Sequence, residues 1–144
     1  MQDLEERFAT ALHSTARSWR QVVDRRLKCL GVSQASWTTI AVAAKATQPL
    51  SQSELADRLA VEGATMVAMV DRLVKSGLVV RESCTRDRRV KYIVLTEAGY
   101  RLFDIVKTEA AKVRTELLAS IQRETLESAT LLLETLHAVI EANP

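Results

Sequence analysis

The stretch SQSELADRLAVEGATMVAMVDRLVKSGLVV, from Ser51 to Val80, decides the fold of this chain. Its first four residues have the S-x-x-E form of a capping box, which satisfies free amides at the start of a helix. That helix is short, and a turn at 61–63 separates it from a second helix that ends at Gly77, a residue suited to a left-handed cap. The residues expected to face inward are Leu55, Leu59, Met66, Val67, Val70, Leu73 and Val74. Helix, tight turn and helix are the outline of a helix-turn-helix.

Two β-branched runs follow this motif, at residues 78–80 and 90–95, and they predict a hairpin. Its tip is basic: Arg81 to Lys91 contains five basic and two acidic residues, a net charge of +3 compared with +2 for the whole chain. The hairpin is therefore expected to contact something anionic. Arginine suits the narrow minor groove of DNA, because a guanidinium loses its hydration shell more easily than an ammonium. The simpler alternative is a solvated turn.

Helices are expected on both sides of this central region. Apolar residues at three- and four-residue intervals predict a long first helix that ends at Gly31, and Ser33 can cap a second helix. After the hairpin, Thr96 caps a helix with Gly99 on its inner seam, and a break at 122–124 precedes the last helix. The predicted fold class is mainly α (α+β), a winged helix-turn-helix with N- and C-terminal dimerisation helices. The expected segments are the first dimerisation helix at 1–32, the DNA-binding domain at 33–98 and the last dimerisation helices at 99–144.

Composition limits the class of protein. With 144 residues, 47% of them hydrophobic and 26% charged, the chain has the balance of a globular domain. No secretory signal or membrane-length apolar run is found, and two cysteines fit a reducing compartment, so a cytoplasmic protein without membrane contact is expected. His13 and His137 lie in separate terminal segments and belong to no metal-binding motif, so no metal or cofactor is predicted. No catalytic motif occurs, and the chain is not expected to be an enzyme.

A helix-turn-helix presents the start of its second helix to the major groove of DNA. Small residues there allow close approach, and the Thr65 side chain offers a hydroxyl and a methyl group to base edges, unless it serves only as a helix cap. Hydroxyls at the start of the supporting helix are candidate phosphate contacts. The predicted DNA-binding residues of the two helices are Ser51, Ser53, Gly63, Ala64, Thr65, Ala68, Met69 and Arg72; those of the hairpin are Arg86, Asp87, Arg88, Arg89 and Lys91.

The order of short motifs resembles the MarR family of bacterial regulators over roughly residues 10 to 100. The motifs are Glu54-Leu55-Ala56, Val70-Asp71-Arg72-Leu73, Gly77-Leu78-Val79, Asp87-Arg88-Arg89 and Leu95-Thr96-Glu97-Ala98-Gly99. The SlyA-like branch is indicated by Trp19-Arg20, by Asp24-Arg25-Arg26-Leu27-Lys28 and by Ser83-Cys84. That branch tends to carry a basic residue where this chain has Ala68.

This resemblance implies a homodimer that reads a pseudo-palindromic operator in double-stranded DNA, most often as a repressor. By the same resemblance, the hairpin is the wing of the motif. Arg89 is expected to insert into the minor groove, Asp87 to stabilise the wing, and Arg86 and Arg88 to bind phosphates. The terminal segments also carry more apolar surface than one small lobe can bury, which favours a homodimer over a monomeric core. The residues expected at that dimer interface are Leu4, Phe8, Leu12, Leu117, Ile121, Leu126, Leu133, Leu136 and Ile140.

The resemblance further implies a ligand crevice, often receptive to small aromatic acids, between the dimerisation helices and the DNA-binding lobe. Candidate lining residues are His13, Arg17, Trp19, Arg20, Trp37 and Met66, although residues spaced like Trp37 and Met66 are more often part of a core. Two alternatives stay open. One is a redox-sensing regulator that uses Cys84 or Cys29, and the other is a helical protein-interaction module that does not bind DNA.

Overall fold

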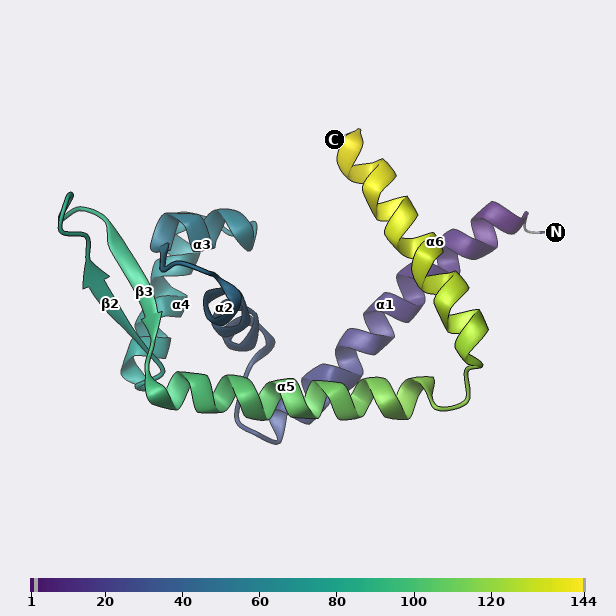
Figure 1. The fold of residues 1–144 in the computed structure, drawn as a ribbon, viewed down its shortest axis with the longest axis horizontal. Helices are drawn as coiled ribbons and strands as arrows, with labels where there is room; N and C mark the ends of the chain where they lie inside the picture. The colour runs from purple at the N-terminus through teal and green to yellow at the C-terminus, as the bar shows by residue number, and fades with distance from the viewer. Residues whose placement is uncertain (2, 144) are drawn as a thin grey trace. The chain divides into compact units, whose positions relative to one another are not determined.

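The computed structural model describes residue 1 and residues 3–143 (Figure 1). Its elements in chain order are α1 (Leu4–Lys28), α2 (Gln34–Lys45), β1 (Leu50–Ser51), α3 (Gln52–Arg58), α4 (Gly63–Lys75), β2 (Val79–Ser83), β3 (Lys91–Leu95), α5 (Glu97–Leu118) and α6 (Arg123–Ala142). The chain divides into two compact units, residues 1–111 and residues 112–144. The predicted fold class, mainly helical with a winged helix-turn-helix, is confirmed.

α3 and α4 form the predicted helix-turn-helix, beside the hairpin of β2 and β3 in Figure 1. The capping box is present, because Ser51 Oγ accepts a hydrogen bond from the Glu54 amide at 3.1 Å and Glu54 Oε1 accepts one from the Ser51 amide at 3.4 Å. The turn between the helices contains Ala60 with a φ of 53°, a left-handed conformation that few residues with a Cβ adopt. After α4, Gly77 has a φ of 75°, as its predicted role as a helix stop requires.

The core of this lobe lies between the helix-turn-helix, α2 and the sheet. Leu55, Met66 and Val70 are fully buried, and Ile40 of α2 and Ile93 of β3 belong to the same cluster. Apolar contacts among six elements, α2, β1, α3, α4, β2 and β3, therefore fix α4 against the sheet that carries the hairpin.

The inner face of α4 is rotated slightly from the predicted one. Its buried residues are Met66, Met69, Val70 and Leu73. The prediction that Val67 and Val74 face inward is wrong, since their side chains are 40% and 38% exposed. They lie on the flank of the buried stripe, seven residues apart and hence on one side of the helix.

The sheet has three antiparallel strands in the order β1-β3-β2. β2 and β3 pair from Val79 opposite Leu95 to Ser83 opposite Lys91, which is the predicted hairpin. β1 was not predicted from the sequence, because two residues are too few to show a period. It pairs Leu50 with Ile93 and so ties the start of α3 to the hairpin.

α5 begins with the predicted cap. Thr96 Oγ1 accepts a hydrogen bond from the Gly99 amide at 3.1 Å and donates one to the Gly77 carbonyl at 2.6 Å. The Thr96 amide donates to the Leu78 carbonyl at 3.0 Å. The end of the hairpin, the start of α5 and the segment after α4 are therefore held at one corner.

α1 packs on the same unit as the helix-turn-helix. Leu27 near its end, Val32 before α2 and Val106 of α5 form a second buried cluster, against which Trp37 packs. The division at residues 111 and 112 thus differs from the three predicted segments, because these contacts join α1 and most of α5 to the DNA-binding lobe.

The unit of residues 112–144 contains the end of α5 and all of α6. None of the described residues of α6 is buried, and its large exposed apolar side chains are Leu131, Leu132, Leu133, Val139 and Ile140. In the described part of the chain, no helix has the length and the hydropathy that crossing a membrane requires.

Candidate nucleic-acid interface

The outer face at the start of α4 is made of small residues. Gly63, Ala64, Thr65 and Ala68 are all exposed. The N-cap residue, Glu62, makes no side-chain hydrogen bond to the helix, so the first amides of α4 remain free for water or a phosphate. Thr65 is the third helical residue rather than the cap, which leaves its hydroxyl available at this face.

Two predicted DNA-binding residues of the helices are buried instead. Met69 faces the core, where its sulfur accepts a hydrogen bond from the fully buried Thr39 hydroxyl at 2.6 Å. Ser51 is also buried, and its hydroxyl is occupied by the capping box. The predictions that Met69 and Ser51 contact DNA are therefore wrong, because Met69 packs in the core and the Ser51 hydroxyl caps α3. Ser53 and Arg72 are exposed.

The tip of the hairpin is held by Asp87 and Arg89. Asp87 Oδ1 accepts hydrogen bonds from the Arg89 amide at 3.0 Å and from Arg89 Nε at 3.2 Å, while Oδ2 accepts one from Nη2 at 3.3 Å. The Arg89 side chain lowers the pKa of the Asp87 carboxyl, and its amide adds to the effect. The Arg89 side chain is nevertheless 91% exposed, so the pair orders the tip without hiding the guanidinium.

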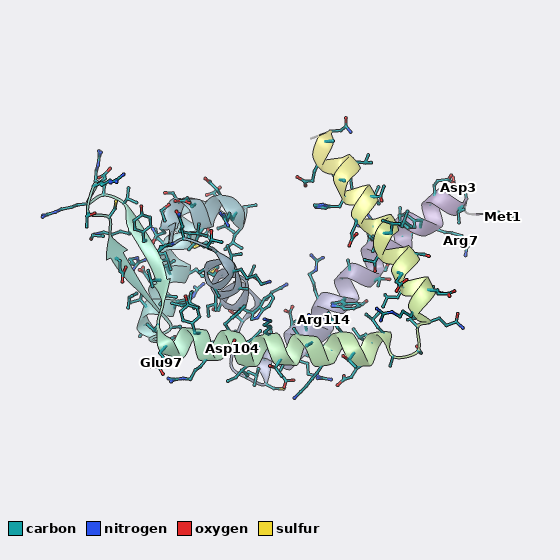
Figure 2. All side chains as sticks on the ribbon, in the orientation of Figure 1. Met1, Asp3, Arg7, Glu97, Asp104 and Arg114 are labelled. Carbon is teal, nitrogen blue, oxygen red and sulfur yellow. The ribbon has the colours of Figure 1, made fainter. Side chains whose placement is uncertain are left out.

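The other basic residues of the tip differ in their surroundings. Arg86 and Arg88 are exposed and form no ion pair within the described part of the chain. Lys91 Nζ donates a hydrogen bond to Ser83 Oγ at 2.6 Å across the two strands. Figure 2 shows long side chains that end in nitrogen reaching outward from this tip. Exposed guanidinium groups, of which that of Arg89 is held by the Asp87 carboxylate, are suited to binding phosphates.

Arg81 does not belong to this free charge. Its guanidinium contacts Asp71 of α4, Gln52 of α3 and a carbonyl of α4. The sequence count of five available cations in the hairpin is therefore too high by one.

Cys84 lies where β2 ends and the tip begins. The backbone amide of Arg86, that of Asp87 and the Tyr92 hydroxyl all donate to its sulfur and together lower the pKa of the thiol. The Tyr92 oxygen is 3.8 Å from this sulfur. Cys29 is exposed, and its thiol donates to the Arg25 carbonyl at 3.5 Å.

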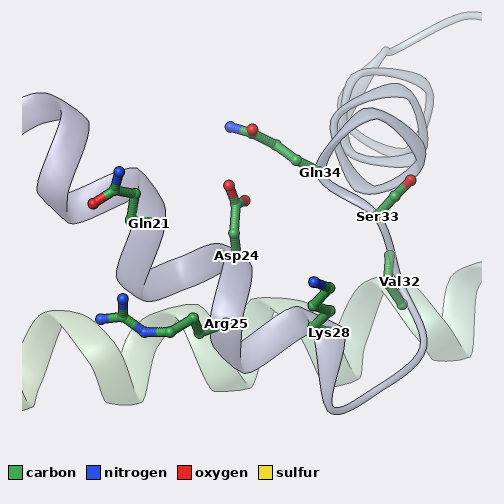
Figure 3. Close-up of a pocket in the computed structure, with 7 residues that line it drawn as sticks. All are labelled: Gln21, Asp24, Arg25, Lys28, Val32, Ser33 and Gln34. Atoms are coloured by element: carbon green, nitrogen blue, oxygen red, sulfur yellow. The ribbon is translucent and has the colours of Figure 1, made fainter.

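A cavity of about 420 Å³ lies between the end of α1 and the start of α2. It is lined by Gln21, Asp24, Arg25, Lys28, Val32, Ser33 and Gln34, and Figure 3 shows Asp24 and Gln34 extending into the space between the two helices. One carboxylate oxygen of Asp24 is buried without a hydrogen-bond partner in the described structure. A buried acceptor of this kind is satisfied by water or by a donor on a bound molecule.

None of the six predicted ligand residues lines this cavity. His13, Arg17 and Arg20 are exposed along α1, and Trp19 is half-buried there. The prediction for Met66 is wrong, because its side chain is fully buried in the helix-turn-helix core.

Trp37 is half-buried against the cluster of Leu27 and Val106, and its Nε1 has no partner among the described residues. The lining residues of α1 were missed, although their spacing of three, one and three residues places them near one another on the helix. No group of three potential metal ligands occurs in the described part of the chain.

Comparisons with known proteins agree with this geometry. A model of the MarR family matches residues 43–91, which span the helix-turn-helix and most of the hairpin. The chain is similar to the solved transcriptional regulator PA3341, with 37% sequence identity, coverage of 94% of this chain and 99% of that chain, and a TM-score of 0.79.

Two more distant structures share the fold. One is a MarR of Staphylococcus aureus solved with salicylate and kanamycin, at 21% identity, a TM-score of 0.87 and coverage of 98% of this chain and 95% of that one. The other is CouR from Rhodococcus jostii RHA1 bound to p-coumaroyl-CoA, at 24% identity, a TM-score of 0.76 and coverage of 94% and 95%.

Proposed function

The chain belongs to the MarR family of transcriptional regulators, and we propose that it is a repressor that binds a pseudo-palindromic operator as a homodimer and is released by a small phenolic acid. The observation that carries this proposal is the ordered, exposed arginine tip beside a helix start made of small residues. Both belong to the same compact unit.

The two parts of this surface suit two grooves of one duplex. The start of α4, with Gly63, Ala64 and Thr65, fits the major groove, where small residues allow close approach and Thr65 reaches base edges. The tip with Arg89 then lies at the neighbouring minor groove, whose negative potential attracts arginine. Arg86 and Arg88 add phosphate contacts.

A second copy of this chain is the partner that fits the terminal helices. Leu4 of α1 is 72% exposed and Leu131 of α6 is 65% exposed. A helix that exposes several large apolar side chains and has no buried residue among those described is unfavourable in water, so α6 is expected to be covered in the working protein. A dimer also supplies the two wings that inverted half-sites require.

The cavity between α1 and α2 is the proposed effector site. Arg25 and Lys28 offer cations to a carboxylate, and the unpartnered Asp24 oxygen accepts a hydrogen bond from a phenolic hydroxyl. α2 begins at this cavity and reaches α4 through the bond between Thr39 and Met69. A ligand that shifts the start of α2 is therefore expected to change the position of α4, to the extent that it binds one arrangement better than the other.

Duplex binding as a function of salt tests the proposal. We expect a site selected from random duplex to contain inverted half-sites about one turn, roughly 34 Å, apart. Affinity, measured by fluorescence anisotropy, is expected to fall about a thousandfold or more between about 50 and 200 mM salt, because bound phosphates release counterions. Sedimentation is expected to give a dimer. A monomer, or a protein that ignores duplex DNA at low salt, would contradict the proposal and favour a protein-interaction module.

The same assay tests the effector. We expect 4-hydroxybenzoate to release the duplex and phenol, which lacks the carboxylate, to act far less. Lys28→Met is expected to raise the effective concentration of 4-hydroxybenzoate about tenfold, since a charged hydrogen bond is lost. Lys45→Met, on the exposed end of α2, is the matched control and is expected to change nothing. An unchanged response of Lys28→Met to 4-hydroxybenzoate would contradict this cavity as the effector site.

A redox response at Cys84 is a second candidate, favoured by the lowered pKa of its thiol. In a Cys29→Ser background, the rate of Cys84 alkylation by iodoacetamide is expected to reach half its maximum below about pH 8.5, the value of a free cysteine, because donors stabilise the thiolate. Tyr92→Phe removes one donor and is expected to shift this midpoint upward. A midpoint at or above that of free cysteine, read by mass spectrometry across pH, would remove Cys84 as a sensor.

A further inference from the structure

We propose that Arg81 is a positioning residue. It holds the wing, which is the hairpin of β2 and β3, against the recognition helix α4, so that Arg89 and the start of α4 reach adjacent grooves together. This inference rests on the proposed DNA binding and assigns no direct DNA contact to Arg81.

One guanidinium joins three elements of the DNA-binding lobe. From β2, Arg81 Nη2 pairs with Asp71 Oδ1 of α4 at 2.7 Å and donates to the Val67 carbonyl of α4 at 3.4 Å. Arg81 Nε donates to Gln52 Oε1 at the start of α3 at 3.1 Å. Within the described structure, no other side chain of β2 hydrogen-bonds to both α3 and α4, so this guanidinium is the polar link between the wing and the helix-turn-helix.

Because Arg81 lies some distance from the tip of the hairpin, a small rotation at Arg81 displaces the tip. Arg86 at the tip follows Arg81 by five positions, and β2 ends at Ser83, so at about 3.3 Å per extended residue the tip lies at most about 17 Å beyond the link. A rotation of about 10° at Arg81 would therefore move the tip by up to about 3 Å, more than a hydrogen bond tolerates. A small rotation of the hairpin about Arg81 is therefore enough to move Arg89 out of contact with the minor groove.

Charge supports the same assignment. Asp71 lies on α4, seven residues after Ala64, and its side chain is 59% exposed. An unpaired carboxylate on the recognition helix would repel phosphates. The Arg81 side chain, 27% exposed, neutralises it. An ion pair as open as this adds little to stability by itself. Together with the hydrogen bonds to the Val67 carbonyl and to Gln52, it fixes where β2 lies against the two helices.

A double-mutant cycle between Arg81 and Arg89 tests the inference. Arg81→Met and Arg89→Ala are each expected to weaken duplex binding about tenfold or more, but the double variant is expected to be only slightly weaker than the worse single one. Once the wing is displaced, Arg89 no longer contributes to the affinity, so its removal causes little further loss. Arg26→Met is the matched control, because it removes a partly exposed ion pair to Glu109 in the same unit. Its effect is expected to add fully to that of Arg89→Ala.

Two further variants separate placement from charge. Arg81→Lys keeps the charge but not the three-way geometry, so it is expected to behave like Arg81→Met in the cycle; full recovery would overturn the positioning role. Strict additivity of Arg81→Met and Arg89→Ala, with unaltered melting curves, would also overturn it. If Arg81→Met fails to fold, Arg81→Gln repeats the cycle. Failure of the unaltered protein to bind duplex would instead refute the proposed function itself.

Discussion

Replacing Gly99 with alanine is expected to lower the free energy of unfolding by about 3 kcal/mol. A Cβ on this residue would run into the backbone carbonyl of Leu78 and would lie 3.2 Å from Leu95 Cγ. The carbonyl cannot move away freely, because its oxygen accepts the Thr96 amide at 3.0 Å. Either the cap of α5 or the start of β2 must shift. Because native domains are stable by only about 5–15 kcal/mol, the loss is a large share of the total.

Gly63→Ala is the matched control for this prediction. An added Cβ there meets no atom within 4 Å, and alanine is the better helix former, so stability is expected to stay equal or rise by up to about 1 kcal/mol. Urea unfolding followed by the helical circular dichroism signal measures both variants. If Gly99→Ala unfolds at the same urea concentration as the unaltered protein, the corner of Gly99 and Leu78 is more open than described.

The parts of the fold that could be predicted from the sequence are those governed by local rules. The capping box at Ser51 and the left-handed stop at Gly77 each depend on a few neighbouring residues, and both are present. The choice between Val67 and Met69 for the core is not local. Both lie at the edge of an apolar stripe, and the position of the sheet and α2 decides which is buried.

The candidate site follows the same division. The small residues predicted to contact DNA at the start of α4 are exposed, as the phase of an amphipathic helix requires, and their contact with DNA stays a prediction. Arg81 was counted as a free cation, because a tally of charges does not contain the 2.7 Å contact with Asp71. The cavity was not predicted, because the predicted ligand site was built around tryptophan side chains, whereas polar residues such as Asp24 and Lys28 line the cavity.

Arg89→Ala is expected to weaken binding of the selected operator by about 10- to 100-fold, the range of one well-placed groove contact. The global fold is expected to be unaffected, because the side chain is 91% exposed and bonds only to Asp87 in the described structure. The bond from the Arg89 amide to Asp87 Oδ1 is kept in the variant and still shapes the tip. The loss therefore reports on DNA rather than on stability. Melting curves and sedimentation are expected to match those of the unaltered protein.

Arg123→Ala is the control that isolates this effect from a general loss of charge. Arg123 is 90% exposed and pairs with Glu127 at 3.1 Å, so the variant removes the same charge from an ion pair of similar openness. Its affinity for the operator is expected to stay within about twofold of the unaltered protein, because Arg123 belongs neither to the hairpin tip nor to the start of α4, where the DNA contacts are proposed. Equal losses in the two variants, measured by anisotropy on one duplex, would mean that the chain responds to net charge alone. A loss confined to Arg89→Ala, with matching melting curves and sedimentation in both variants, would show that binding needs the Arg89 side chain at the wing tip and not only the total charge.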